Sequence, residues 1–208
     1  GSLNIGISPT WLMEDVLPRV IMDLVVDRPG LNLGLFSRVS SKELLETLRS
    51  GELDIIIGTE QVGISDENIE ITYLTEDIHG VIVRKGHPIL KHPSNSVSDF
   101  NRYGWIIREE GTLYRQRLEV LYMDQGRALP PPVIETNSIA FTLTSIASTD
   151  HLSVSRDADI KSLGFEGIEM LDFPFKWVRK VSVMRRRDAP LSDVGREFIQ
   201  ELVNTFAN

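Results

Sequence analysis

Short apolar runs alternate with longer amphipathic stretches along the first part of the chain. The apolar runs lie at 3–7, 31–36 and 53–58. Runs of this length without a polar alternation are typical of parallel strands that are covered on both faces. The stretches between them repeat their apolar residues with the helical period, which predicts helices over 18–27 and 40–51. This order of elements predicts a βαβαβ unit.

A second alternation of the same kind begins after residue 100. It predicts strands at 104–108, 133–137 and 151–155 and helices at 113–125, 138–147 and 156–163. Two extended segments, 69–74 and 79–88, separate the two regions, and a stretch rich in turn-forming residues follows them. We therefore expect a second βαβαβ unit.

The end of the chain predicts how the two units are joined. It contains a long strand pattern at 177–186 and a helix at 193–206 that Ser192 caps. Because this strand needs no partner in the second unit, we expect it to cross back to the first. The predicted fold class is therefore α/β, with two Rossmann-like βαβ lobes joined by a two-strand hinge. The expected boundaries give lobe I as 1–84 plus 175–208, and lobe II as 85–174.

Composition and charge narrow the possible functions. The chain has 208 residues, which is enough for two lobes of about 100 residues each. Its formal charge of −8 argues against a nucleic-acid-binding surface, because phosphate binding requires clustered Lys and Arg. The basic run from Arg185 to Arg187 is followed by Asp188, so we interpret it as a solvated strand end. The absence of cysteine excludes disulfides and thiolate chemistry.

The distribution of apolar residues predicts no contact with a membrane. No apolar run approaches the roughly 20 residues of a bilayer span, and the N-terminus lacks the layout of a secretion signal. We therefore expect a cytoplasmic location. The opening Gly-Ser pair suggests that the natural chain extends further upstream.

Glu52 and Asp54 directly precede an apolar run, which raises the question of whether they form a catalytic pair. Gly51 ends the preceding helix, so Glu52 lies in the turn and Asp54 at the entry of the strand. In open α/β sheets, ligands bind at the opposite, C-terminal ends of the strands. We therefore interpret both carboxylates as structural.

Polar residues follow the C-terminal ends of the predicted strands in both lobes. They are Ser8, Thr10, Ser40, Ser41 and Thr59 in lobe I, and Arg108, Thr112, Thr136, Asn137, Ser138, Ser155 and Arg156 in lobe II. Two such rims facing each other would form a cleft suited to a small polar or anionic ligand. Arg108 offers a bidentate fork to a carboxylate. Ser40 and Asn137 are also interpreted as helix caps, and Trp11 as a core residue or a platform for a sugar ring.

The sequence contains no enzyme or metal signature. The segment "GISPT" at 6–10 lacks the closing glycine of a nucleophile elbow. The four histidines, His79, His87, His92 and His151, have no spacing typical of metal ligands, and no dinucleotide or Walker fingerprint occurs. We therefore expect no metal, no cofactor and no catalysis.

As a set, these features resemble the effector-binding region of LysR-type transcriptional regulators over essentially the full length of the chain. The matching features are Pro18, Pro29-Gly30, the helix-opening serines, "GELDIIIG" at 51–58 and "GHPIL" at 86–90. The segment 111–155 is most similar to the galactose-binding-protein regulator subgroup. One departure is "STDHLSVSRDAD" at 148–159, where many members of the family have a Gly-rich turn and a proline.

The resemblance implies a type 2 periplasmic-binding-protein-like fold with a small-molecule effector in the cleft, namely a sugar, a sugar acid or another small carboxylate. It also implies a homodimer, or a tetramer in the full-length protein, and an N-terminal helix-turn-helix domain, absent here, through which alone DNA is bound. The effector contacts that it implies are Ser8, Thr10, Ser41, Thr59, Arg108, Thr112, Asn137 and Ser138.

Two alternatives share the two-lobe architecture. A solute-binding protein of a transport system would be a monomer preceded by a signal peptide, whereas a regulator would be a dimer preceded by a helix-turn-helix domain. An enzyme would need a general acid, a general base or a nucleophile in the cleft, and the rim residues supply hydroxyls, amides and arginines instead. The sequence therefore favours the regulator.

Overall fold

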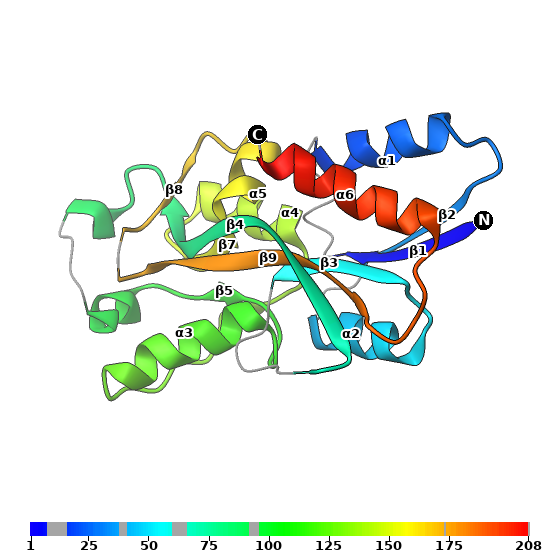
Figure 1. The fold of residues 1–208 in the computed structure, drawn as a ribbon. Helices are drawn as coiled ribbons and strands as arrows, with labels where there is room; N and C mark the ends of the chain where they lie inside the picture. The colour runs from blue at the N-terminus through cyan, green and yellow to red at the C-terminus, as the bar shows by residue number, and fades with distance from the viewer. Residues whose placement is uncertain (8–15, 38–40, 60–65, 92–95, 173, 208) are drawn as a thin grey trace. The chain divides into compact units, whose positions relative to one another are not determined.

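The computed structural model describes residues 1–7, 16–37, 41–59, 66–91, 96–172 and 174–207. The chain divides into two compact units (Figure 1), the first of residues 1–76 and 179–208 and the second of residues 77–178. Two strands run from one unit into the other, namely β4 (Ile69–Arg84) and β9 (Lys176–Arg186). The predicted pair of crossing strands is therefore present.

The first unit is built on the parallel strands β1 (Ser2–Ile7), β2 (Asn32–Ser37) and β3 (Ile55–Thr59). Its helices are α1 (Val16–Val26), α2 (Ser41–Ser50) and α6 (Asp193–Ala207). Helices α1 and α6 cover one face of the sheet, where Ile55 and Ile57 are buried, and α2 covers the other face, where Ile56 is buried (Figure 1). Burial on both faces explains the apolar runs of β1 and β3. The sequence also predicts coverage of the run at 31–36, but β2 is an edge strand whose residues are exposed or half-buried.

Asp54 has the structural role that the sequence predicts. Its carboxylate accepts a hydrogen bond of 2.8 Å from the backbone N–H of Asn4, and its own N–H donates to the carbonyl of Asn4 at 2.9 Å. These two bonds join the entry of β3 to β1. Glu52 is exposed in the turn before the strand.

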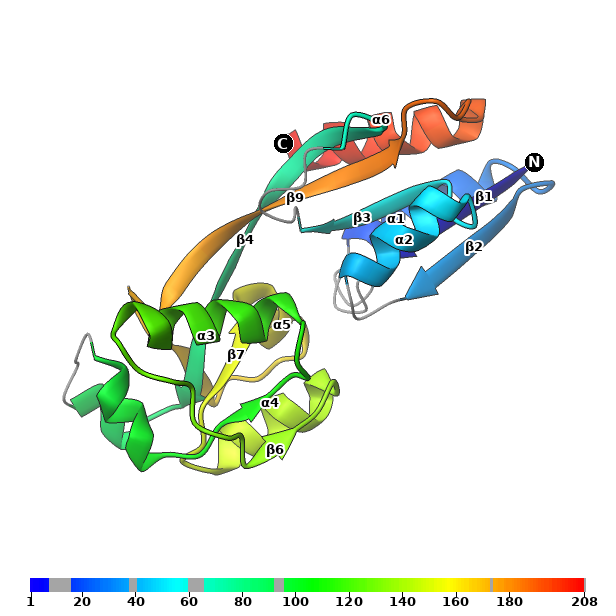
Figure 2. The ribbon, with the colours of Figure 1, turned by 90° about the horizontal axis from the view of Figure 1, so that it is seen from below.

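The second unit consists of short strands between two helical layers. Its strands are β5 (Ile106–Ile107), β6 (Ile134–Glu135), β7 (Ser153–Arg156) and β8 (Ile168–Met170), and its α-helices are α3 (Leu113–Asp124), α4 (Ile139–Ser148) and α5 (Asp157–Ser162). Two 3₁₀ helices lie at Pro88–Lys91 and Val97–Arg102. Helix α3 packs on one face of these strands, and α4 and α5 pack on the other (Figures 1 and 2).

The strands of the second unit differ in extent from the prediction. The regions 104–108 and 133–137 contribute only two residues each to strands, which pair in parallel with each other. Trp105 forms a single parallel bridge to Leu152, which links β5 to the start of β7. Arg156 ends β7 instead of opening the following helix, which begins at Asp157.

The segments predicted separately at 69–74 and 79–88 form one continuous strand, β4. The units divide this strand between residues 76 and 77, and they divide β9 between 178 and 179, whereas the sequence placed the boundaries at 84/85 and 174/175. Strand β4 passes into the second unit nearer to its N-terminus than the sequence predicts, and this difference has a physical reason. Its C-terminal part forms antiparallel ladders with β7 and β8, which both belong to the second unit.

The basic run near the end of β9 is the solvated strand end that the sequence predicts only in part, because Arg187 is exposed whereas Arg185 and Arg186 are half-buried. Arg185 pairs with Glu70 at 2.5 Å, and Arg187 donates to the carbonyl of Glu67 at 3.1 Å. Arg186 donates through Nη1 to the carbonyl oxygens of Leu48 and Leu53, the latter at 3.0 Å. These guanidinium groups fasten β9 to the end of α2 and to the start of β4.

Replacing Arg186 by Ala is expected to lower the free energy of unfolding by about 1–2 kcal/mol, because two backbone carbonyls lose a charged donor. Urea denaturation monitored by circular dichroism would measure the effect. Lys180→Ala is the control, because its side chain is exposed on the same strand. Equal stability of the two variants would contradict this role for Arg186.

The motif "GHPIL" has a structural role in the second unit. His87 is fully buried, and its Nδ1 accepts a 3.0 Å hydrogen bond from the N–H of Ile89. Its Nε2 lies 3.0 Å from the carbonyl oxygen of Asp150, which fixes the neutral tautomer with the proton on Nε2.

In the part of the chain that the structure describes, no helix is long and apolar enough to cross a bilayer.

Candidate functional site

In the first unit, the predicted rim lies at the C-terminal ends of three parallel strands. The register pairs Ile7 of β1 with Ser37 of β2 and with Ile57 of β3, so all three strands end at one edge. Thr59 is the last residue of β3 and is half-buried, and Ser41 is the first residue of α2. Ser8, Thr10, Trp11 and Ser40 lie outside the described residues.

In the second unit, three strand ends also meet at one edge. Strands β5 and β6 pair in parallel with Ile107 opposite Glu135, and the bridge from Trp105 brings β7 alongside in the same direction. The residues that end or follow these strands therefore share an edge. They are Arg108, Thr136, Asn137, Ser138, Ser155 and Arg156. The strand pairing thus places the ends of β5, β6 and β7 at one edge, where Ser155 and Arg156 are buried.

Arg108 is the most prominent cation at this edge. Its guanidinium lies over the ring of Tyr114 with 4.6 Å from Cζ to the ring centroid, which is a cation–π contact. The side chain is half-buried, and no ion pair joins it to a carboxylate of the described chain. The aromatic face of Tyr114 therefore positions Arg108, whose planar fork has the geometry to bind a carboxylate or a phosphate.

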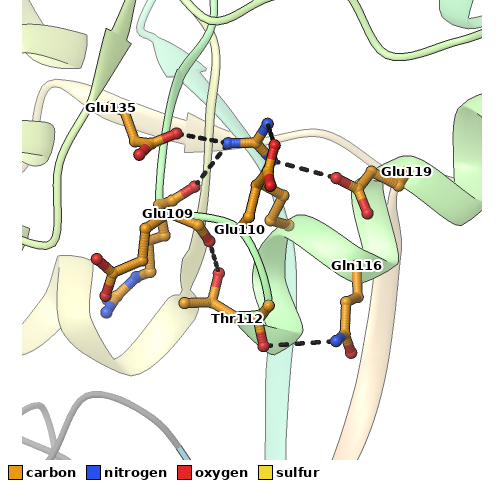
Figure 3. A network of polar contacts seen from close by, with 9 residues as sticks. Glu109, Glu110, Thr112, Gln116, Glu119 and Glu135 are labelled. Carbon is orange, nitrogen blue, oxygen red and sulfur yellow. Dashed lines mark hydrogen bonds and ion pairs between the residues drawn. The ribbon is translucent and has the colours of Figure 1, made fainter.

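A network around Arg115 fixes the loop that carries Arg108 (Figure 3). The guanidinium of Arg115 forms ion pairs with Glu135 at 2.7 Å, Glu119 at 3.1 Å and Glu110 at 3.3 Å. Burial alone would lower the pKa of Arg115, but the hydrogen bonds with Glu119 and Glu135 outweigh it and the pKa is raised. The network joins β6, the loop 108–112 and α3. These ion pairs stabilise the position of the loop backbone at Arg108.

The hydroxyl and amide residues of this edge have different local roles. Thr112 is buried, and its Oγ1 donates to the carbonyl of Glu109 at 2.9 Å instead of capping α3 (Figure 3). Ser138 caps α4, because its Oγ accepts a 3.2 Å hydrogen bond from the N–H of Phe141. The predicted cap at Asn137 is therefore wrong by one residue. The Asn137 side chain is exposed.

A buried group of charges lies directly behind this edge, and the sequence did not predict it. Arg156 is 2% exposed, Asp159 is 2% exposed and Asp77 is 7% exposed. The Nε atom of Arg156 lies 3.4 Å from Asp77 Oδ2 and 3.4 Å from Asp159 Oδ1. His79 Nε2 lies 3.8 Å from Asp77 Oδ2, and His79 is 3% exposed. We call these four residues, Asp77, His79, Arg156 and Asp159, the buried charge cluster.

Burial dominates the electrostatics of this cluster. It raises the pKa of Asp159 to about 6 from its ordinary value of 3.8, although the charges of Arg156 and Arg108 act in the opposite direction. Burial also lowers the pKa of Arg156, while the charge of Asp159 opposes this shift. One signal in the sequence could have revealed the cluster. Asp77 and His79 occupy the face of β4 that also carries the buried Val81 and Val83, so their inward direction follows from the two-residue period.

Comparison with known proteins agrees with the resemblance. The family model "LysR substrate binding domain" matches residues 1–207. The HTH-type transcriptional regulator GbpR of Azospirillum brasilense is 30% identical over 156 residues, which are 74% of this chain and 45% of that protein. GbpR of Rhizobium radiobacter is 26% identical over 155 residues, which are 74% of this chain and 50% of that protein.

A solved structure shows the same fold. The regulatory domain of CcmR from Synechocystis PCC6803, in complex with 2-PG, superimposes with a TM-score of 0.83 and 21% identity, covering 100% of this chain and 98% of that one. The chain therefore belongs to the LysR substrate-binding domain family and has the type 2 periplasmic-binding-protein-like fold. It spans about half the length of the curated relatives that it matches, and these relatives are transcriptional regulators. The comparisons favour the regulatory prediction over a transport protein.

Proposed function

We propose that this chain is the effector-sensing domain of a LysR-type transcriptional regulator and that its effector is a small anion. The family match supports the sensing role. The observation that carries the choice of an anion is Arg108, whose guanidinium is positioned over Tyr114 at the common edge of three strands and forms no ion pair with a described carboxylate.

The surroundings of Arg108 fit a ligand that carries a carboxylate or a phosphate. Its planar fork can bind either group with two parallel hydrogen bonds. The hydroxyl of Ser138 and the exposed amide of Asn137 follow β6 at the same edge and supply further donors. The complex of the CcmR regulatory domain with 2-PG adds support, because it shows that this fold accommodates a small ligand. We propose Ser8, Thr10, Ser41, Thr59 and Thr112 as additional contacts.

The mechanism that we propose is conformational. An effector shifts a regulator only if it binds one arrangement of the protein more tightly than another. In the full-length homodimer or tetramer, this preference would change the spacing of N-terminal helix-turn-helix domains, which alone would contact DNA. Since such a protein must reach the chromosome, we also propose that it acts in the cytoplasm.

A thermal-shift screen of this chain tests the effector class, using matched panels of neutral sugars, sugar acids and small carboxylates. At a ligand concentration of a hundred times Kd, binding is expected to add about 2.7 kcal/mol to the free energy of unfolding, which raises the melting temperature by several degrees. We expect this shift from anionic compounds and its loss in Arg108→Gln. The control is Arg127→Gln, because Arg127 is an exposed arginine of the same unit.

Other results would redirect the proposal. A shift from neutral sugars alone, retained in Arg108→Gln, would contradict the anionic effector and would favour recognition by hydroxyl groups. A shift from anionic compounds that both arginine variants lose equally would show a general charge effect instead of a site at Arg108.

A further inference from the structure

We propose that the buried charge cluster binds one exchangeable proton near neutral pH and that the proton is a second input to this domain, separate from the effector. The cluster combines two carboxylates, one guanidinium and one imidazole, all nearly inaccessible to water. It thus contains a histidine and an aspartate that can each accept a proton.

Burial of the two carboxylates favours the uptake of one proton. With His79 neutral, the positive charge of Arg156 faces the carboxylates of both Asp77 and Asp159. The charge of Arg108 also acts on Asp159, but burial outweighs both arginines and the pKa of Asp159 remains raised. A net charge in a buried position is costly, so proton uptake by a nearby group is favoured. The Nε atom of Arg156 lies 3.4 Å from each carboxylate, which is longer than the roughly 2.7–2.9 Å of a charge-assisted hydrogen bond.

The proton has two places where it can reside. One is His79, whose Nε2 is 3.8 Å from the carboxylate of Asp77, so that the protonated ring would form an ion pair with it. The other is Asp159, whose pKa burial raises to about 6. The imidazole of His79 can accept this proton because the neighbouring carboxylate of Asp77 favours a charged ring. The two sites share one proton and are therefore expected to titrate as a coupled pair.

Aromatic rings link a proton on His79 to two neighbouring arginines. The ring of Tyr114 lies 5.2 Å from the imidazole between centroids, and the stacked ring of Trp177 lies 6.4 Å from it. Each of these rings also contacts an arginine, since Arg108 lies over Tyr114 and Arg117 lies over Trp177 at 5.5 Å from Cζ to the ring centroid. The charged groups around His79 therefore come from β4, β7, α3, α5 and the loop after β5, and a positive charge on the ring would change its balance with both arginines.

The position of the cluster in the chain explains how protonation could alter the domain. Asp77 and His79 belong to β4 just beyond the point where this strand leaves the first unit. Trp177 belongs to β9 just before that strand returns to the first unit. One proton therefore acts on both strands that join the units, which are the segments that any rearrangement of the domain must bend.

Nuclear magnetic resonance of the histidine ring protons tests the proposal, with His79→Gln used to assign the His79 signal. We expect this signal to titrate between about pH 5.5 and 7.5. In Asp159→Asn one negative charge is removed, so the midpoint is expected to fall by about one pH unit or more. The control is Asp157→Asn, because Asp157 lies on the same helix but pairs with Lys161. Its midpoint is expected to stay within about 0.2 units of the wild type.

Hydrogen–deuterium exchange then tests the conformational part, after correction for the intrinsic pH dependence of amide exchange. Between pH 5.5 and 7.5, we expect exchange in β4 and β9 to change at least threefold in the wild type and not in Asp159→Asn. A His79 signal that stays constant over this range in the wild-type protein would overturn the proposal. Titration without any change in exchange would overturn the role of the proton as an input.

Discussion

Replacing Arg156 by Met is expected to lower the free energy of unfolding by about 3–5 kcal/mol at pH 7.5, the range found when one partner of a buried ion pair is removed. Met fills similar space without a charge, so the loss reflects electrostatics more than a cavity. Without Arg156, the carboxylates of Asp77 and Asp159 would face each other without the guanidinium that lies 3.4 Å from both. Only unfolding or proton uptake would relieve the repulsion between these two buried carboxylates.

Urea denaturation of wild type, Arg156→Met and the double variant Arg156→Met/Asp159→Asn measures this effect. The double variant removes one of the two carboxylates, so it is expected to recover roughly half of the lost stability by the same charge argument. The control is Arg127→Met, because Arg127 is exposed and should change stability by less than about 0.5 kcal/mol. A loss below about 1 kcal/mol in Arg156→Met would show that the cluster does not depend on its guanidinium.

The elements that the sequence predicted correctly are those that local patterns determine. The buried residues of β1 and β3 form apolar runs because helices cover both faces of the sheet there. The coverage predicted for 31–36 was wrong, because β2 lies at the edge of the sheet and is mostly exposed. Helix α6 was predicted almost to its ends because Ser192 caps it, with its Oγ accepting a 3.2 Å hydrogen bond from the N–H of Gly195. Each of these signals lies within a few residues of the element that it defines.

The elements that the sequence missed depend on residues far apart in the chain. Strand β4 was divided into two segments because Glu76 and Asp77 interrupt its apolar pattern. The strand nevertheless continues through Asp77, whose carboxylate lies beside Arg156 from another strand. Arg156 was expected to open a helix and instead ends β7 inside the core. No local pattern reveals such pairing, since a single charged residue at a strand end is usually solvated.

The candidate site shows the same division between local and distant determinants. Its second-unit residues were found because they follow predicted strands, and the parallel pairing of β5 with β6 places them together. Which of them can meet a ligand depends on hydrogen bonds that the sequence does not contain. The Oγ1 of Thr112 donates to the carbonyl of Glu109, and the Oγ of Ser138 accepts from the N–H of Phe141, whereas Arg108 forms no ion pair with a carboxylate of the described residues.

Ionisation of Asp159 is expected to lower the free energy of unfolding of the domain as the pH rises. The folded-state pKa of Asp159, about 6, is above its ordinary value of 3.8, so between these values the folded state binds more protons than the unfolded state. The free energy of unfolding therefore falls with increasing pH across this window, by about 3 kcal/mol for one group at about 1.4 kcal/mol per pKa unit. The loss is complete above pH 6 and absent below pH 3.8.

Asp159→Asn isolates this contribution, because the amide resembles the protonated carboxyl and does not titrate. We expect the variant to match the wild type near pH 3.5 and to be about 3 kcal/mol more stable at pH 7.5, as measured by urea denaturation across the range. The difference between the two proteins removes the opposite trends of other acids, such as Asp66, whose pKa the hydrogen bond from Arg49 lowers. Asp157→Asn should show a constant difference from the wild type, since Asp157 lies outside the cluster. A difference between Asp159→Asn and the wild type that stays the same at every pH would contradict this prediction. It would show that the pKa of Asp159 is the same in the folded and the unfolded state, so that the fold stabilises the ionised carboxylate as well as water does.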